Sequence, residues 1–229
     1  MYRTAETDTT YRDDLRRSLW DRRYRTEGTI WGEAQSHTCR LLSERLNPGS
    51  KITELGSGYG RDLAHLLSLG HDARGIEASS EAILLCESRL AEVGYPGRVD
   101  RCRIENWMPS DESLDAVLSH RTLHLLPEDT VAAVAGTIAR ALRPGGVACL
   151  SARDRRDFDP SRMRMIGPDV AEYIGTHRAG HRIHFWTPER FRNTFGPLFR
   201  RTEFVKIREP ESAAFPDSIT HCTVMIAFR

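Results

Sequence analysis

The stretch that most constrains the fold of this chain is an apolar run that ends in three alternating glycines. Ile52 to Leu55 reads as a buried β-strand, and Gly56, Gly58 and Gly60 follow it. Glycine allows positive φ and carries no Cβ, so this loop can turn sharply and let a ligand approach the backbone. The helix expected after Gly60 directs unpaired N–H groups and its positive dipole end toward the same place. The segment predicts a ligand-binding turn, with a tight turn that binds nothing as the plainer interpretation.

A carboxylate closes the next predicted strand, residues 73–77. Glu77, at its end, can accept hydrogen bonds from both hydroxyls of a ribose, which favours an adenosine-containing cofactor. Nicotinamide and flavin sites use G-x-G-x-x-G, but here the third glycine comes one residue early and Glu54 precedes the first by two positions. A nicotinamide-dependent oxidoreductase remains an alternative, although we find no set of hydride-transfer residues for it.

Strand and helix signals alternate from Lys51 to Ala152, which predicts a parallel α/β sheet with helices on both faces. The expected strands cover 51–55, 73–77, 99–104 (polar enough for an edge), 114–119 and 147–151. Apolar residues at helical spacing follow the glycine loop and recur in 80–93 and 127–142.

The two ends of the chain depart from this alternation. Residues 9–46 predict two short helices joined at 26–28, and residues 153–186 are a polar, arginine-rich insertion. Thr187 followed by Pro188 predicts the start of another helix. Residues 202–208 and 221–228 are expected as two closing strands joined by a polar loop that contains two prolines.

Charge and cysteine content limit the possible partners. The 229 residues include 33 Lys and Arg against 32 Asp and Glu, so no bulk field favours a polyanion and we expect no nucleic-acid partner. The five cysteines are scattered, without C-x-x-C or metal-type spacing, which indicates free thiols in a reducing compartment. No run of 18 apolar residues is present. We therefore expect a soluble cytoplasmic protein, monomeric or homodimeric, with no bound metal and no membrane partner.

Several segments resemble class I S-adenosylmethionine (SAM) methyltransferases in their order along the chain. Glu54-x-Gly56-x-Gly58-x-Gly60 is similar to the first motif of that family, residues 105–107 and 114–120 to two later motifs, and residues 143–146 to the break before strand five. The resemblance covers residues 50–152 well and the flanks loosely. It implies a Rossmann-like seven-stranded, mostly parallel sheet with an antiparallel last strand, binding SAM and releasing S-adenosylhomocysteine (SAH).

The same resemblance implies the cofactor-binding residues. An acidic residue of the first motif helps to hold the amino end of the methionine part, and a carboxylate after strand three accepts from the adenine amine. The expected cofactor contacts are Glu54, Gly56, Ser57, Gly58, Gly60, Arg61, Glu77, Ala78, Glu105, Asn106, Trp107 and Ser119. For Trp107 and Glu105 the alternatives are a core position and a solvated strand end.

The aromatic flanks are similar to the small-molecule branch of the family, which includes tellurite-resistance-type and thiopurine-type enzymes. An aromatic lid suits a sulfonium, which gains from π faces and from exclusion of water. We therefore expect residues 1–48 to form a helical cap over a SAM-binding domain of residues 49–229, with the 153–186 insertion over the acceptor. The expected acceptor contacts are Trp20, Tyr24, Trp31, Arg153, His181, His184 and Trp186. Alternatively, the aromatics simply attach the cap to the sheet.

Two histidines after strand four are the candidate bases for methyl transfer. In-line displacement requires mainly alignment and exclusion of water, and a base helps when the acceptor is a hydroxyl or a protonated amine. His120 lies where ligands bind in open α/β sheets, and His124 follows one helical turn later. A surface or packing role is the alternative for each. No Asp/Asn-Pro-Pro-Tyr or Pro-Cys segment typical of DNA methyltransferases follows strand four, which favours a small acceptor. A SAM-binding protein without transferase activity would carry the same cofactor motifs.

Overall fold

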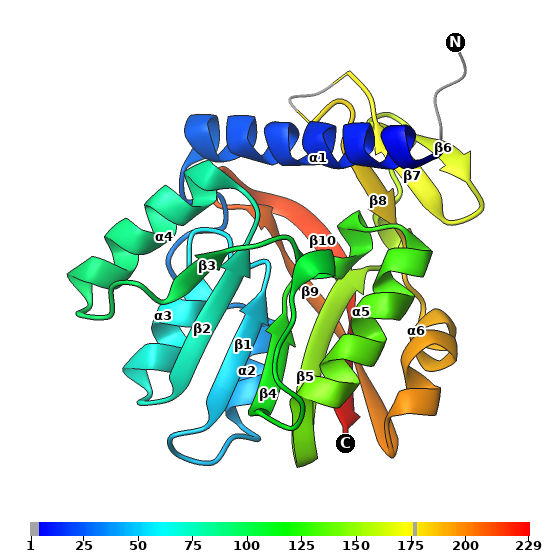
Figure 1. Ribbon diagram of the computed structural model, residues 1–229. Helices are drawn as coiled ribbons and strands as arrows, with labels where there is room; N and C mark the ends of the chain where they lie inside the picture. Colours follow the sequence, from blue (N-terminus) through cyan, green and yellow to red (C-terminus); the bar gives the residue numbers. More distant parts are fainter. Residues whose placement is uncertain (1–4, 176–177) are drawn as a thin grey trace.

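A seven-stranded sheet forms the centre of the protein (Figure 1). The computed structural model describes residues 5–175 and 178–229. The strand order is β3-β2-β1-β4-β5-β10-β9. The strands are β1 (Lys51–Leu55), β2 (Asp72–Glu77), β3 (Val99–Arg101), β4 (Leu114–Ser119), β5 (Leu142–Arg153), β9 (Arg201–Ser212) and β10 (Phe215–Phe228). The first five run parallel, and β10 pairs antiparallel with both neighbours. The predicted Rossmann-like class and the edge position of β3 are confirmed.

Helices cover both faces of this sheet, as the apolar spacing predicts. Leu63 and Leu66 of α3 (Arg61–Ser68) and Cys86 of α4 (Ser80–Glu92) pack in one core cluster together with α2 (His37–Ser43). Val131 and Ile138 of α5 (Glu128–Ala141) pack in the other, beside α6 (Pro188–Phe195). The Ser79 and Thr187 side chains cap α4 and α6 by accepting from backbone N–H groups. Short 3₁₀ helices η1 (Ile104–Asn106), η2 (Leu123–Leu125), η3 (Arg155–Asp157) and η4 (Gly196–Leu198) complete the chain.

One long helix, rather than the expected short one, begins the described chain. Helix α1 (Ala5–Glu27) lies across the ends of the strands that face the top of Figure 1. It ends at Glu27, Gly28 follows with a φ of +61°, and residues 28–36 lead to α2. The join is therefore longer than the predicted 26–28 turn. In the described part of the chain, no helix has the length and apolar character needed to cross a bilayer.

The arginine-rich insertion folds into a second, three-stranded antiparallel sheet. It consists of β6 (Met163–Gly167), β7 (Val170–Tyr173) and β8 (Arg182–His184). Met163 and Tyr173 are buried in its own small core, while Arg164 projects to solvent. We predicted no strands here because charged side chains alternate with the few apolar ones, and only one face of the small sheet is buried.

The closing hairpin is longer than predicted. The expected loop between 208 and 221 consists largely of strand, with Thr220 opposite Glu209 and Ile219 opposite Pro210. Pro210 is tolerated because β9 is the outermost strand of the sheet. This extension carries Glu209 and Glu211, both buried, toward the end of the sheet where α1 and the insertion lie.

Candidate functional site

A cavity lies where β1, β2 and β4 end, beneath α1. Its empty volume, including its open mouth, is about 1040 Å³. The strand order reverses between β1 and β4, which is where open α/β sheets bind ligands. We call it the first cavity. Its lining includes these predicted residues: Trp20, Tyr24, Trp31, Glu54, Gly56, Ser57, Gly58, Arg61, Glu77, Ala78, Glu105 and His120.

The three glycines of the loop all have positive φ, which explains why no other residue suits them. Their φ values are +75° at Gly56, +55° at Gly58 and +78° at Gly60. A Cβ at Gly56 would lie 2.4 Å from the Thr122 side chain, and one at Gly58 would lie 2.7 Å from the Tyr24 hydroxyl. We expected these glycines to leave room for a ligand. Side chains of the protein itself also use the room that the missing Cβ atoms leave. Gly60 begins α3 and is outside the lining.

Glu77 is held in one orientation by the backbone around the glycine loop. Its Oε2 accepts from Gly58 N at 2.9 Å, and its Oε1 accepts from Ala78 N and Ser79 N, each at 2.8 Å. Burial raises the pKa of Glu77, and these three N–H donors oppose the shift. A carboxylate oriented in this way presents its remaining acceptor sites to the cavity.

A second carboxylate, Glu54, lies buried on the other side of the loop. Its Oε2 is inaccessible to solvent and has no hydrogen-bond partner in the described structure, as is also true of Ser57 Oγ. Burial, followed by the nearby Asp62, raises the pKa of Glu54 well above its usual value. An unsatisfied buried carboxylate oxygen is costly, and it therefore indicates a missing donor at this end of the cavity.

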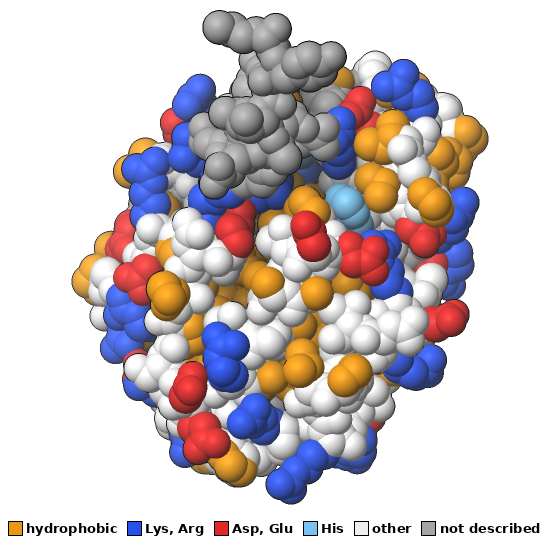
Figure 2. Space-filling model, turned by 45° about the vertical axis from the view of Figure 1, so that its right-hand side comes forward, with side chains coloured by type: hydrophobic (Ala, Val, Ile, Leu, Met, Phe, Trp, Pro, Cys, Tyr) orange, Lys and Arg blue, Asp and Glu red, His pale blue; other side chains and the backbone are white. Residues whose placement is uncertain are grey.

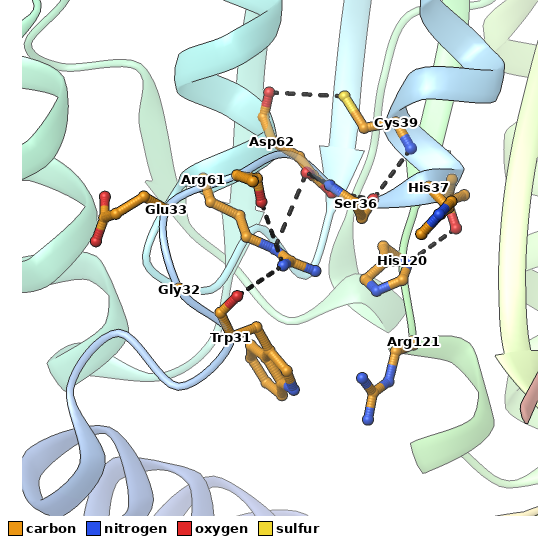
Figure 3. Close-up of polar contacts among 12 residues, drawn as sticks. Trp31, Gly32, Glu33, Ser36, His37, Cys39, Arg61, Asp62, His120 and Arg121 are labelled. Carbon is orange, nitrogen blue, oxygen red and sulfur yellow. Dashed lines mark hydrogen bonds and ion pairs between the residues drawn. The ribbon is translucent and has the colours of Figure 1, made fainter. Parts of the chain in front are cut away.

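Asp62, which sequence reasoning did not select, organises the same end of the cavity. Its carboxylate accepts from Ser36 N and Ser36 Oγ, both at 2.6 Å, and so fixes the start of α2. Arg61 beside it donates to the Trp31 carbonyl at 3.2 Å and to the Ala34 carbonyl at 3.3 Å (Figure 3). The loop after α1 is thereby tied to the first turn of α3.

Of the three residues expected around the adenine, only Glu105 lines the first cavity. Glu105 lines the cavity, but its Oε1 accepts from Arg16 of α1 at 2.9 Å and from Arg103 at 2.7 Å. Trp107 is buried in the hydrophobic core next to α5, outside the lining, and Asn106 is exposed. Another expected contact, Ser119, donates its Oγ proton to the Leu55 carbonyl and is also outside the lining.

The predicted aromatic residues come together above the glycine loop. Trp20 lies 5.7 Å from Tyr24 and 6.2 Å from Trp31 between ring centroids. The guanidinium of Arg23 lies over both indoles, at 5.3 and 5.4 Å. Trp31 also stacks on Tyr59, at 6.2 Å with an interplanar angle of 12°. This cluster closes the cavity from the α1 side.

His120 belongs to a polar network that draws on distant parts of the chain. Its Nδ1 lies 2.8 Å from Thr38 Oγ1 and 3.1 Å from Ser151 Oγ, and its Nε2 lies 3.2 Å from Glu209 Oε2. Glu209 also accepts from His37 N at 2.9 Å. Although burial opposes the shift, His120 lowers the pKa of Glu209 below its usual range. No local sequence motif links Glu209 to His120.

A second cavity of about 340 Å³ adjoins the first and shares Trp20, Trp31, Arg121 and Leu125 with it. Its remaining lining residues are Arg23, His124, Arg153, Tyr173, Arg178, His181 and Ile183. Burial, then Arg153 and Arg121, lower the pKa of His124 well below its usual value, so this imidazole is neutral near pH 7. His124 thus faces the second cavity rather than the first.

Arg153 and the neighbouring arginine of the insertion are tied into a buried cluster. Arg153 Nε donates to Asp157 at 2.5 Å, and another of its nitrogens donates to the Tyr173 hydroxyl. Arg178 donates to Glu211 at 2.5 Å and to the Tyr173 hydroxyl at 3.1 Å. The cluster joins η3, β7 and β9, and so connects the insertion to the main sheet.

Two expected acceptor contacts lie outside both cavities. Trp186 is buried in the core against Phe191, at 4.9 Å between ring centroids. On β8, burial and Arg190 lower the pKa of His184 to about 4. Within the described residues, no group of three potential metal ligands forms, and the five cysteines are free thiols.

Comparisons with known proteins address the fold and its central segment. Residues 52–146 match the family model described as a methyltransferase domain. A search of curated proteins found no match.

Solved structures share the overall fold at low sequence identity. A SAM-dependent methyltransferase from Methanosarcina mazei aligns with a TM-score of 0.69 at 18% identity, over 82% of this chain and 96% of that one. The Burkholderia thailandensis 1,6-didemethyltoxoflavin-N1-methyltransferase, with bound 1,6-didemethyltoxoflavin and SAH, gives 0.67 at 20%, over 100% of this chain and 91% of the other. A structure described for thioacetal formation during echinomycin biosynthesis gives 0.70 at 18%, over 93% and 91%.

Proposed function

We propose that this chain, whose residues 52–146 form a methyltransferase domain within a class I methyltransferase fold, transfers the methyl group of SAM to a small-molecule acceptor. The observation that carries the proposal is a pair of carboxylates that line the first cavity next to the glycine loop, the buried Glu54 and the half-buried Glu77. They suit the two ends of SAM, a cationic amino group and a ribose diol.

The residues around the first cavity fit this cofactor. Glu54 Oε2 lacks a donor, and an ammonium group would satisfy both its charge and its hydrogen-bonding capacity. Glu77 would accept from the ribose hydroxyls, since backbone N–H groups already fix its orientation. Arg61, which also lines the cavity, would face the carboxylate of the methionine part. When bound, SAM supplies an electrophilic methyl group on a sulfonium.

The chain's own contribution is alignment and exclusion of water. Trp20 and Trp31 line both cavities. Their aromatic rings would favour the positive charge of a sulfonium placed where the two cavities meet. We propose that α1 with the following loop acts as the lid over cofactor and acceptor. Polar contacts fasten it: Asp21 accepts from Ser79 Oγ at 2.6 Å, and Arg16 pairs with Glu105 at 2.9 Å.

We retain His120 as the proposed base for acceptors that must lose a proton. A proton taken up by His120 would be stabilised by Glu209, 3.2 Å from its Nε2. Both ring nitrogens lie beside protein groups, so His120 must exchange one of these contacts to reach an acceptor. His124 is the weaker candidate because its buried surroundings favour the neutral form so strongly.

The acceptor is proposed to be small for two reasons. The second cavity is small, about 340 Å³ against about 1040 Å³ for the first, and residues of α1, η2 and the insertion line it. On the face shown in Figure 2, basic and acidic side chains of the described residues are interspersed rather than gathered by sign. A long polyanion would gain little from such a surface.

Two measurements test this function. Calorimetric titration should show SAH binding and no comparable binding of NADH. Incubation with methyl-labelled SAM and a panel of thiols, amines, phenols and carboxylates should then transfer label to a small product. Failure to bind SAH contradicts the proposal. Binding of SAH without transfer to any member of the panel favours the non-enzymatic SAM-binding alternative.

A further inference from the structure

Arg121 stands out among the residues between the two cavities. It follows His120 at the end of β4, lines both cavities, and has a φ of +54°, which a residue with a side chain seldom adopts. Its guanidinium lies over the Trp31 ring, 5.5 Å from the centroid, and Figure 3 shows both side chains near His120. Its backbone N–H donates to Ser151 Oγ at 3.0 Å, which holds the strained residue in place.

The other arginines of the second cavity have carboxylate partners. Arg23 pairs with Glu27 at 2.9 Å, Arg153 with Asp157 at 2.5 Å, and Arg178 with Glu211 at 2.5 Å. These pairs leave the three guanidinium charges locally balanced. These three arginines therefore do not require a bound anion to neutralise their charge.

Arg121 has no such partner. Within the described structure, no carboxylate oxygen lies within 4.0 Å of its guanidinium, and its one side-chain hydrogen bond is to the neutral Thr220 Oγ1 at 3.3 Å. Burial lowers the pKa of Arg121, and the positive charges of Arg153 and Arg178 act in the same direction. Glu209, the nearest acidic influence, is already engaged by His37 and His120. Arg121 is half-buried, so its guanidinium has lost part of its hydration without gaining a counter-ion, and an anion at this point would offset that cost.

We infer that the methyl acceptor carries a carboxylate and that Arg121 binds it at the junction of the two cavities. This inference rests on the proposed methyl transfer and specifies its substrate class. One uncompensated guanidinium matches a single negative charge, and its fork can bind a carboxylate through two parallel hydrogen bonds. Trp20 and Trp31, with Leu125 and Ile183 further in, provide flat apolar surfaces for an aromatic or aliphatic body.

The test uses matched pairs of ligands on the SAH-saturated full-length protein. The pairs are benzoate with benzamide, phenylacetate with phenylacetamide, and indole-3-acetate with indole-3-acetamide, each titrated calorimetrically. In at least one pair we expect the carboxylate to bind about tenfold more tightly than the amide, the effect of one charge-assisted contact. Arg121→Met should abolish this preference, and Arg121→Lys should retain part of it.

Arg155→Met is the matched control, because Arg155 is exposed and pairs with Asp169 at the surface. It should keep the carboxylate preference. Both Met variants should bind SAH within about threefold of the unmodified protein. Arg121→Met should not lower the melting temperature, because the half-buried charge that it removes pairs with no carboxylate. A purely structural Arg121 would instead lower it.

Three outcomes overturn the inference: no pair prefers the carboxylate, the preference survives in Arg121→Met, or that variant loses SAH affinity. The last would assign Arg121 to the carboxylate of the cofactor. If the unmodified protein binds no SAH, the proposed function fails, and carboxylate preference is then measured on the ligand-free protein by the same criterion.

Discussion

The two adjoining cavities are built in different ways. The first draws its key groups from short, contiguous segments, with Glu54, the glycine loop and Glu77 all inside two strand–turn units. The second gathers residues from α1, the end of β4, the insertion and, through Glu211, the closing hairpin. Backbone N–H groups organise the first cavity, whereas buried charged side chains organise the second. The fold around the first cavity should therefore tolerate loss of side-chain charge more easily than the fold around the second.

The largest effect should come from breaking the charge cluster of the second cavity. Arg153→Met removes a guanidinium that serves Asp157 and Tyr173 and leaves a buried carboxylate unpaired. Loss of one partner from a buried pair costs about 3–5 kcal/mol of unfolding free energy. Urea unfolding measures it, with the exposed Arg155→Met as control. A loss below about 1 kcal/mol would mean that this cluster does not hold the fold around the second cavity together.

The next effect concerns His120, which lines the first cavity. If His120 is the base, His120→Ala should lower kcat about 100-fold and flatten its dependence on pH, while SAH affinity changes little. Glu209→Gln should lower kcat less, because Glu209 positions His120 and stabilises its charged form without reaching the acceptor. Steady-state kinetics from pH 5 to 9 separate these roles. Equal turnover of His120→Ala and unmodified protein at every pH ends the base assignment.

A smaller effect is expected at the ribose end of the first cavity. Glu77→Ala should weaken SAH binding about 30-fold, equivalent to about 2 kcal/mol for a charge-assisted contact. The protein should remain folded, although the N–H groups of Gly58, Ala78 and Ser79 lose their acceptor. Glu77→Gln, which keeps one acceptor oxygen, separates loss of orientation from loss of charge, and Glu92→Ala on the exposed side of α4 is the control. An unchanged dissociation constant in Glu77→Ala would remove Glu77 from the site.

The same contrast explains what could be predicted from the sequence. Part of the lining of the first cavity could be predicted because Glu54, the glycines and Glu77 are set by local rules: strand ends, positive φ and helix starts. The strands of the parallel part of the sheet and the buried helix faces follow from apolar spacing in the same way. Contacts that cross the chain, such as Glu209 with His120, leave no local pattern and were missed.

Apolar residues near the site were the least predictable. Trp107 and Trp186 were expected at the ligands, yet both pack in the core, because burial in a core and burial against a ligand select the same side chains. Arg121 was overlooked although it directly follows His120. Arg121 matters in our proposal because it lacks a carboxylate partner. Only the folded structure shows this, since it pairs Asp157 and Glu211 with other arginines.

The smallest expected effect concerns Glu54, whose replacement should raise the stability of the fold and weaken SAH binding. The folded-state pKa of Glu54 is raised above its usual 4.5, so its stability contribution is fully present below that pH and is lost as pH rises through the folded value. Glu54→Gln should therefore match the unmodified protein at pH 4 and exceed its unfolding free energy by about 1 kcal/mol at pH 8. The same variant should bind SAH more weakly at pH 8, since it no longer offers a charge to the amino group. Denaturant unfolding and calorimetry at both pH values test this, with Glu92→Gln as control. A variant that is less stable at pH 8, or that binds SAH equally well, would show that Glu54 serves the fold and not the cofactor.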